Sequence, residues 1–321
     1  MQLRHLRYFV KIVEAGSFSR AAATIHVAQP ALSQQIAELE EQLGLSLLQR
    51  SARGVRPTPA GEVLYREASS ILRQMEQLPG IVRSSVGETE GTVGLGMSST
   101  LAASLGGPFI ESCKTALPKV TLKFAVADSE TVKARIESQT LDLALVYEDE
   151  LVAKFARAPL FRQRLYLICR EPLRDKAASV SLSQLAKLPL ILPSQPNVTR
   201  SVLDRAFSAA NIVPNVAAEA DVLSSMMSTV RTGVGHAIIP KGDLTDIGGG
   251  DMPRPLLIEP PLHLTASIIS SSDFPLTSAG EAVRNVLAQF VNQHLRIAKP
   301  PGIEWIGGEP AISAADTRIL K

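Results

Sequence analysis

Four residues suited to reading DNA bases stand close together near the N-terminus, in a segment without long cationic side chains. They are Gln29, Pro30, Ser33 and Gln34. Glutamine amides and serine hydroxyls can hydrogen-bond to base edges in the major groove, whereas long cations bind phosphate whatever the sequence. Proline suits the first position of a helix. The four residues therefore predict a helix whose N-terminal half contacts base pairs.

Three arginines follow in the segment 47–58, LLQRSARGVRPT, which contains no acidic residue. They are Arg50, Arg53 and Arg56. The segment reads as a strand, a turn and a strand, with Gly54 in the turn. Guanidinium groups bind phosphates and are attracted to the negative potential of a narrow minor groove. We therefore expect a basic hairpin with Arg53 at its tip, against the DNA backbone or the minor groove.

Three helices must position these side chains. Apolar residues at three- and four-residue spacing predict a first helix at 3–15, and Ser17 can cap a second helix at 18–25. Pro30 opens a third helix, which Gly44 ends. The apolar face of this third helix contains Leu32, Ile36, Leu39 and Leu43. With the basic hairpin, these elements predict a winged helix-turn-helix.

The same pattern has an alternative interpretation. Exposed Gln/Ser faces also occur in protein-binding modules, and Glu38, Glu40 and Glu41 weaken a simple basic-patch argument. The pattern alone therefore leaves a protein-interaction module open.

The segment 6–61 carries a resemblance to a known family. It reads LRYFVKIVEAGSFSRAAATIHVAQPALSQQIAELEEQLGLSLLQRSARGVRPTPAG and resembles the DNA-binding domain of LysR-type transcriptional regulators over its whole length. Within that family it is most similar to regulators of the nitrogen-assimilation-control kind. The resemblance implies that Gln29–Ile36 is the recognition helix. Leu48 stands where the family usually has Phe, and Gln34 stands where Arg is common, which bears on the bases that are read.

A linker helix is predicted after the hairpin, because no Gly or Pro occurs between Gly61 and Leu78. Its apolar residues alternate four- and three-residue steps, which is a coiled-coil seam. They are Leu64, Ala68, Ile71, Met75 and Leu78. The seam predicts a two-fold dimer that reads inverted half-sites, and the alternative is a helix packed on its own domain. Pro79-Gly80 leaves open whether the helix ends there or continues.

After Gly91 strands and helices alternate, which predicts parallel α/β units in two similar halves. The predicted strands are 93–96, 121–126, 142–147, 190–193, 216–219 and 236–239. The predicted helices are 101–115, 130–138, 199–210 and 222–232. Segments 165–170 and 264–270 could pass between the halves, and helix 278–294 would return to cover the first half. This part resembles the family's effector domain, which has the two-lobed fold of periplasmic binding proteins.

Ligands of open α/β sheets bind beyond the carboxyl ends of the strands, so the cleft between the lobes is the predicted pocket. The candidate residues are Ser98, Ser99, Thr100, Asp128, Ser129, Ser194, Gln195, Asn197 and Thr199. Two facing helix N-termini with hydroxyls favour an anion such as a carboxylate. Sites of the family use the turn at 98–100. The alternative is that these hydroxyls only cap their helices. Tyr147, Glu148 and His236 are further candidates for the cleft.

The sequence lacks the motifs that several classes of protein need for their function. Cys113 and Cys169 have no C-x-x-C partner and are expected to be buried, and the five histidines fit no metal-ligand spacing. The segment 94–99 begins like a dinucleotide-binding fingerprint but lacks its third glycine. No catalytic motif is present. No stretch approaches the roughly 20 apolar residues of a membrane span, so we expect neither a cofactor nor a membrane.

The sequence as a whole predicts an α + α/β protein of 321 residues with a net charge of +2. The expected domains are the winged helix-turn-helix, the linker helix with its hinge, the effector domain and a C-terminal tail. Their bounds are 1–60, 61–90, 91–298 and 299–321, with lobe I at about 91–163 and 267–298 and lobe II at about 164–266. The tail has no predicted role beyond a loose extension or a strap.

We interpret the chain as a DNA-binding transcriptional regulator of the LysR type and not an enzyme. The expected partners are double-stranded DNA, a small-molecule effector and further copies of the chain in a homotetramer, a dimer of dimers. RNA polymerase is a candidate partner, and the expected location is the cytoplasm. The rival interpretation is a solute-binding or enzymatic α/β protein with an N-terminal protein-interaction module.

Overall fold

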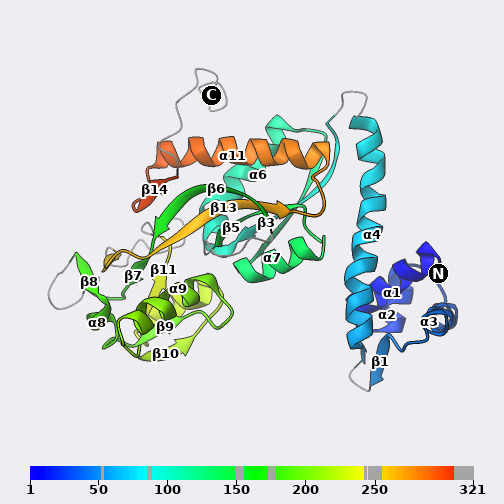
Figure 1. Ribbon diagram of the computed structural model, residues 1–321, viewed down its shortest axis with the longest axis horizontal. Coiled ribbons are helices and arrows are strands. Elements are labelled where there is room, and N and C mark those ends of the chain that lie inside the picture. Colours follow the sequence, from blue (N-terminus) through cyan, green and yellow to red (C-terminus); the bar gives the residue numbers. More distant parts are fainter. Residues whose placement is uncertain are drawn as a thin grey trace. The chain divides into compact units, whose positions relative to one another are not determined.

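A computed structural model describes residues 1–51, 54–84, 89–148, 155–172, 178–241, 244 and 255–306 (Figure 1). The chain divides into two compact units. The first contains Met1–Glu88 together with the short segment Glu137–Thr140, and the second contains the remainder from Thr89 onward.

The N-terminal unit has the predicted order of helices and hairpin. Its elements are α1 (Leu3–Ala15), α2 (Phe18–Thr24), α3 (Gln29–Leu43), the antiparallel strands β1 (Leu48–Ser51) and β2 (Gly54–Pro57), and α4 (Pro59–Ser84). The hydroxyl of Ser17 accepts a hydrogen bond from the backbone N–H of Arg20, as expected for the cap of α2. Helix α3 begins at Gln29, one residue before Pro30, because Ala28 still has extended backbone angles.

One apolar core joins the three short helices to the hairpin. Its fully or nearly fully buried members include Phe9, Ile12, Phe18, Ala21, Leu32, Ile36, Leu39 and Leu47. The hairpin is also joined to the turn between α1 and α2, where the N–H of Val55 donates to the carbonyl of Gly16 at 2.9 Å. Gly54 has φ +113°, and a Cβ there would lie 2.7 Å from that same carbonyl oxygen. Glycine is therefore required where the hairpin meets the turn.

Helix α4 continues through Pro79 and ends at Ser84, which answers the question that the sequence left open. At its other end the helix lies close to the hairpin. A Cβ on Gly61 would stand 2.0 Å from the carbonyl oxygen of Leu47, so only glycine allows this approach.

We predict that Gly61→Ala destabilises the N-terminal unit by about 2–3 kcal/mol, because the methyl group meets backbone that cannot move aside cheaply. Urea unfolding followed by circular dichroism measures this loss. Gly107→Ala is the control, since a Cβ there has nothing within 4 Å. An equal response of the two variants would contradict the close packing at Gly61.

The second unit contains two six-stranded mixed sheets, one in each lobe. The lobe I sheet has the order β14-β6-β13-β5-β3-β4. Its strands are β3 (Gly91–Ser98), β4 (Val120–Ala127), β5 (Leu143–Glu148), β6 (Phe155–Arg164), β13 (His263–Ser271) and β14 (Ile303–Trp305). Strands β3, β4 and β5 are parallel, and β13, β6 and β14 extend the sheet in antiparallel pairs.

The lobe II sheet has the order β10-β9-β11-β7-β12-β8. Its strands are β7 (Tyr166–Ile168), β8 (Ser179–Ser181), β9 (Leu190–Leu192), β10 (Val216–Glu219), β11 (His236–Ile239) and β12 (Leu256–Glu259). Strand β9 lies between β10 and β11, and all three are parallel. The two lobes of the sequence interpretation are thus two sheets of similar size.

Helices cover both faces of each sheet. They are α5 (Ser99–Leu101), which leads through the π-helical turn Ala102–Gly106 into α6 (Gly107–Ala116), then α7 (Ser129–Glu137), α8 (Leu182–Leu185), α9 (Val198–Ala209), α10 (Leu223–Thr232) and α11 (Ser278–Ala298). Helices α6 and α11 lie together on one face of the lobe I sheet, and α7 lies on the other (Figure 1). Cys113 and Cys169 are buried as expected, and burial raises the pKa of Cys169 to about 11.

The chain passes between the sheets at Leu165 and again at Pro260–Leu262. Residues 263–266, which the sequence analysis grouped with lobe II, therefore lie in the lobe I sheet. The same sheet includes part of the tail, because β14 pairs with β6 and the ring of Trp305 packs edge-on against Phe161. The described part of the tail is thus a strap on lobe I, and residues 307–321 lie outside the described residues.

Candidate nucleic-acid interface and ligand pocket

The two faces of α3 differ sharply in burial. Leu32, Ile36 and Leu39 are fully buried in the core of the unit. On the other face Gln29, Pro30 and Gln34 are exposed, and Ser33 is half-buried. The four residues that the sequence singled out therefore lie on the outward side of one helix, where they can meet another molecule.

The N-termini of α2 and α3 lie next to one another. The hydroxyl of Ser19, in the first turn of α2, donates to the side-chain oxygen of Gln29 at 2.9 Å. The amide of Gln34 donates to Glu38 at 3.1 Å. Ser19 belongs to the same surface but was not predicted. Its only sequence signal is its position two residues after the Ser17 cap, in the first turn of α2.

The carboxylates at the end of α3 have local structural partners. One oxygen of Glu40 accepts the backbone N–H of Leu47 at 2.7 Å and that of Leu48 at 3.2 Å. Glu38 accepts from Gln34 and Gln35. The bonds of Glu40 attach the hairpin to α3 and those of Glu38 lie within α3, so acidic residues there do not by themselves argue against a DNA-binding surface.

The hairpin arginines have different surroundings. The guanidinium of Arg50 lies 4.3 Å from the centre of the Phe18 ring, a cation–π contact that orients it. Arg56 is exposed on β2, in register with Gln49 on β1. Arg53, which the sequence placed at the tip, lies outside the described residues.

The predicted seam of α4 divides into two parts. Ala68 is fully buried against Leu6 and Val10 of α1, and Leu64 is partly buried with them. The other seam residues are exposed: Ile71 at 42%, Met75 at 44% and Leu78 at 51%. The helix therefore packs on its own domain at one end and presents an apolar stripe at the other.

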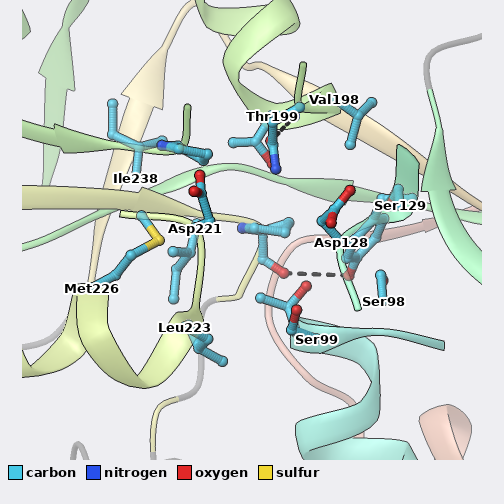
Figure 2. A pocket seen from close by; sticks show the side chains of 16 residues that line it. Ser98, Ser99, Asp128, Ser129, Val198, Thr199, Asp221, Leu223, Met226 and Ile238 are labelled. Carbon is cyan, nitrogen blue, oxygen red and sulfur yellow. Dashed lines mark hydrogen bonds between the residues drawn. The ribbon is translucent and has the colours of Figure 1, made fainter. Parts of the chain in front are cut away.

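A pocket with about 490 Å³ of space between protein atoms lies between the two lobes of the second unit (Figure 2). Its lining residues are Ser98, Ser99, Thr100, Asp128, Ser129, Tyr147, Pro193, Asn197, Val198, Thr199, Asp221, Leu223, Met226, Ile238, Ile239 and Pro240. These residues lie at or shortly after the carboxyl ends of β3, β4, β9, β10 and β11, except Tyr147, which is near the end of β5. Parallel strands thus bring distant segments to one site.

The predicted pocket residues take distinct positions. Seven of the nine candidates line the pocket, and Ser194 and Gln195 do not. The backbone N–H of Ser194 donates to Asp221 at 2.8 Å, and the amide of Gln195 donates to Asp204 at 2.7 Å. Asn197 caps α9 by accepting from the N–H groups of Thr199 and Arg200. Capping is therefore the role of Asn197, whereas the hydroxyl of Ser98 is buried and lacks a partner among the described residues.

The charges of the pocket differ from the expectation of an anionic ligand. Asp128 and Asp221 both line it, and none of its described lining residues is Lys, Arg or His. Asp221 was not predicted, because it follows an edge strand of lobe II. It lines the same pocket as Asp128 only because the two lobes lie against one another. The helix that begins at Ser99 is also short before its π-helical turn, which limits its N-terminal field.

Of the three further candidates for the cleft, only Tyr147 lines the pocket. Its hydroxyl donates to the carbonyl of Pro240 at 3.3 Å, and burial raises its pKa. Glu148 is buried and paired with Arg157 at 2.6 Å, and His236 is not among the lining residues. Glu148 therefore holds β5 to β6 and has no part in the pocket lining.

Comparison with known proteins decides the family. The model of the bacterial regulatory helix-turn-helix proteins of the lysR family matches residues 3–62, and the LysR substrate binding domain matches residues 87–292. The chain belongs to the LysR family. This LysR-family protein is a DNA-binding transcriptional regulator with an effector-binding domain and not an enzyme, as the sequence predicted. The rival interpretation as a solute-binding protein or an enzyme is set aside.

The curated relatives include regulators of the predicted kind. The chain is 33% identical over 299 residues to the nitrogen assimilation regulatory protein nac of Klebsiella aerogenes, covering 91% of this chain and 96% of the relative. It is 31% identical over 296 residues to the protein of the same name from Escherichia coli, with the same two coverages. The resemblance to nitrogen-control regulators is thus confirmed.

Solved structures share the fold. Full-length OxyR from Pseudomonas aeruginosa matches with a TM-score of 0.67 at 22% identity, covering 97% of this chain and 99% of that one. Full-length CbnR in complex with its target DNA matches with a TM-score of 0.65 at 19% identity, covering 90% and 100%. Both are similar to this chain over the DNA-binding and effector-binding parts together.

The described residues contain neither a candidate metal site nor a candidate membrane span. No group of three or more His, Cys, Asp or Glu residues in that part of the chain could hold a metal ion. No helix within the same residues is long and apolar enough to cross a membrane.

We predict that the effector-binding unit loses stability as the pH falls below about 6.5. Burial lowers the pKa of His236 and of His294 from 6.5, so the unfolded chain takes up protons more readily than the folded chain. The free energy of unfolding from urea titrations at pH 7.5 and 5.5 measures the loss. His236→Gln should show a smaller loss than the wild type, and an unchanged loss would contradict a neutral buried His236.

Proposed function

We propose that this LysR-family regulator reads its operator with the outward face of Gln29–Ile36 and holds the adjoining backbone with the hairpin arginines Arg50, Arg53 and Arg56. The observation that carries the proposal is the burial contrast of α3, with three fully buried leucine or isoleucine side chains behind exposed Gln29, Pro30 and Gln34. Ser33 and Ser19 extend the same polar surface. Uncharged donors and acceptors on such a surface suit base edges, and the flanking arginines suit phosphate.

The proposed dimer uses the exposed part of the α4 stripe. Ile71, Met75 and Leu78 are spaced by four and then three residues and present exposed apolar surface. A second copy of α4 would cover it, with Leu64 and Ala68 retained in each subunit's own core. Two such dimers would form the homotetramer. The proposed location is the cytoplasm, where the chromosome is accessible, and RNA polymerase is a candidate partner at the promoter.

The proposed effector site is the pocket between the lobes. Its residues from the sequence prediction are Ser98, Ser99, Thr100, Asp128, Ser129, Asn197 and Thr199. Ser194, also predicted, contributes through its backbone N–H, which donates to Asp221. A small molecule bound there contacts both lobes and can shift their arrangement only as far as it binds one arrangement better than another. Such a shift would change how the subunits present their DNA-binding domains.

Arg56→Ala should weaken binding to the operator and to unrelated DNA by similar factors. The loss of one phosphate contact should also reduce the slope of log affinity against log salt by about 0.9. Gel-shift titrations at several salt concentrations, with an operator selected from random DNA by the wild-type protein, measure both effects. Arg284→Ala removes the same charge from the effector-binding unit and should leave both unchanged.

Gln29→Ala should act differently, because a side chain that reads a base affects discrimination. We expect it to lose about 1–3 kcal/mol of preference for the selected operator while affinity for unrelated DNA stays within a factor of two or so. Equal losses on both DNAs would contradict the role of Gln29 in reading bases.

Met75→Lys should weaken the dimer at least tenfold, because it places a charge in an apolar seam. Analytical ultracentrifugation over a range of protein concentrations measures the dissociation constant. Glu76→Lys introduces the same side chain at the outer position next to the seam and should leave association unchanged. A dimer that tolerates lysine at position 75 as well as at 76 would place the interface elsewhere.

A further inference from the structure

The pocket brings together one carboxylate from each lobe. Asp128 follows β4 in lobe I, and Asp221 follows β10 in lobe II (Figure 2). Each is oriented within its own lobe: Asp128 accepts from the backbone N–H and the hydroxyl of Thr131 at 2.8 and 2.5 Å, and Asp221 accepts from the N–H of Ser194 at 2.8 Å. A carboxylate has about four acceptor positions, so both retain capacity for a further donor.

The lining supplies no compensating positive charge. Asp128 and Asp221 are the ionisable carboxylates of the pocket, and its described lining includes no Lys, Arg or His. Asp128 is half-buried and Asp221 is exposed, and two carboxylates attract a cation and repel an anion at the short range of a ligand in the pocket. The electrostatics therefore favour a positively charged ligand.

A second observation points independently to a ligand with hydrogen-bonding groups. Ser98 is 4% exposed and lines the pocket, and its hydroxyl oxygen has no hydrogen-bond partner in the described structure. Buried hydroxyls are normally satisfied, so a missing partner here is a place for a hydrogen-bonding group of a bound molecule, either a donor or an acceptor. Ser98 lies at the end of β3, in the same pocket as Asp128.

The rest of the lining limits the ligand to a short and partly apolar molecule. Val198, Leu223, Met226 and Ile238 contribute hydrocarbon and thioether surface, mainly from lobe II (Figure 2). The space of about 490 Å³ between the lining atoms is partly open to solvent, so its enclosed part suits only a small ligand. A short aliphatic chain can lie against these side chains while a polar head group meets the carboxylates.

We propose that the pocket binds a small aliphatic ammonium compound, whose cationic head is held by Asp128 and Asp221 and whose N–H groups also reach Ser98. The inference rests on the proposed function, in which this pocket is the effector site. Because the two carboxylates belong to different lobes, a bound ammonium compound links them and stabilises one arrangement of the lobes. The proposed regulation is therefore a response to an amine.

Isothermal titration of the full-length protein tests the ligand class with four-carbon probes of similar size. The probes are 1,4-diaminobutane, butylamine, butyramide and butyrate at constant ionic strength. We expect the two amines to bind and the amide and carboxylate to bind at least tenfold more weakly. Asp221→Asn and Asp128→Asn should each reduce amine affinity tenfold or more, since an ion pair with the ammonium group becomes a hydrogen bond to a neutral amide.

The variants are chosen to remain folded. Asparagine at position 221 keeps the oxygen that accepts from Ser194, and asparagine at position 128 keeps the oxygen that accepts from the Thr131 N–H while its NH2 group can donate to the Thr131 hydroxyl. Unchanged circular dichroism and melting temperature of the unliganded variants check that both fold. Asp273→Asn, at an exposed carboxylate outside the pocket, is the matched control and should bind amines like the wild type.

Three results would overturn the ligand class: tighter binding of butyrate than of butylamine, no amine binding at millimolar concentration, or amine affinity that Asp221→Asn leaves unchanged. Operator binding by the same protein is measured alongside. If operator binding persists while amines fail, the ligand class is wrong and the DNA-binding proposal stands. If operator binding fails in the wild type, the proposed function itself is wrong.

Discussion

Burial of one face of α3 is the constraint on which the DNA-binding part depends. Leu32, Ile36 and Leu39 have no exposed surface, and their contacts with α1 and α2 fix the rotation of the helix about its axis. With that rotation fixed, the polar residues at Gln29 and Gln34 can only face outward. The hairpin is held to the same scaffold by Glu40 and by the turn at Gly16, so its arginines and the face of α3 keep a defined relation.

The effector-binding part uses a different device to bring its residues together. Parallel strands end at one edge of each sheet, and the two edges meet at the pocket. Asp128 and Asp221 lie far apart in the sequence, with all the elements from α7 to β10 between them. A ligand that contacts both lobes therefore acts on their relative arrangement, which is what regulation through the DNA-binding domains requires.

Local patterns in the sequence predicted most of the fold. Helical periodicity, the Ser17 cap and the glycine at position 44 were enough for α1, α2 and α3, because these signals act within a few residues. Alternating strand and helix predicted both lobes and most of the pocket. The sequence left open whether the helix continues past Pro79, as it does. An interior proline costs free energy, and whether the helix tolerates it depends on the contacts along the whole helix.

Local sequence patterns could not predict the negative charge of the pocket. Asp221 has no local motif, and its place beside the predicted hydroxyls depends on which strands pair in lobe II. The glycines that imitate a dinucleotide motif have a packing explanation instead: a Cβ on Gly96 would lie 2.6 Å from a methyl group of Val132. Tertiary contacts determine the position of Asp221 and the need for glycine at position 96, and the spacing of residues in the sequence does not reveal such contacts.

Protection of operator DNA from dimethyl sulfate tests the central claim most directly, because this reagent methylates guanine N7 in the major groove. The account predicts that the wild-type protein protects guanines in two inverted half-sites and that Gln29→Ala restores reactivity at one position in each, with the remaining protection intact. An unchanged pattern in Gln29→Ala, or no protection by the wild-type protein even at low ionic strength, would contradict the assignment of α3 to the major groove.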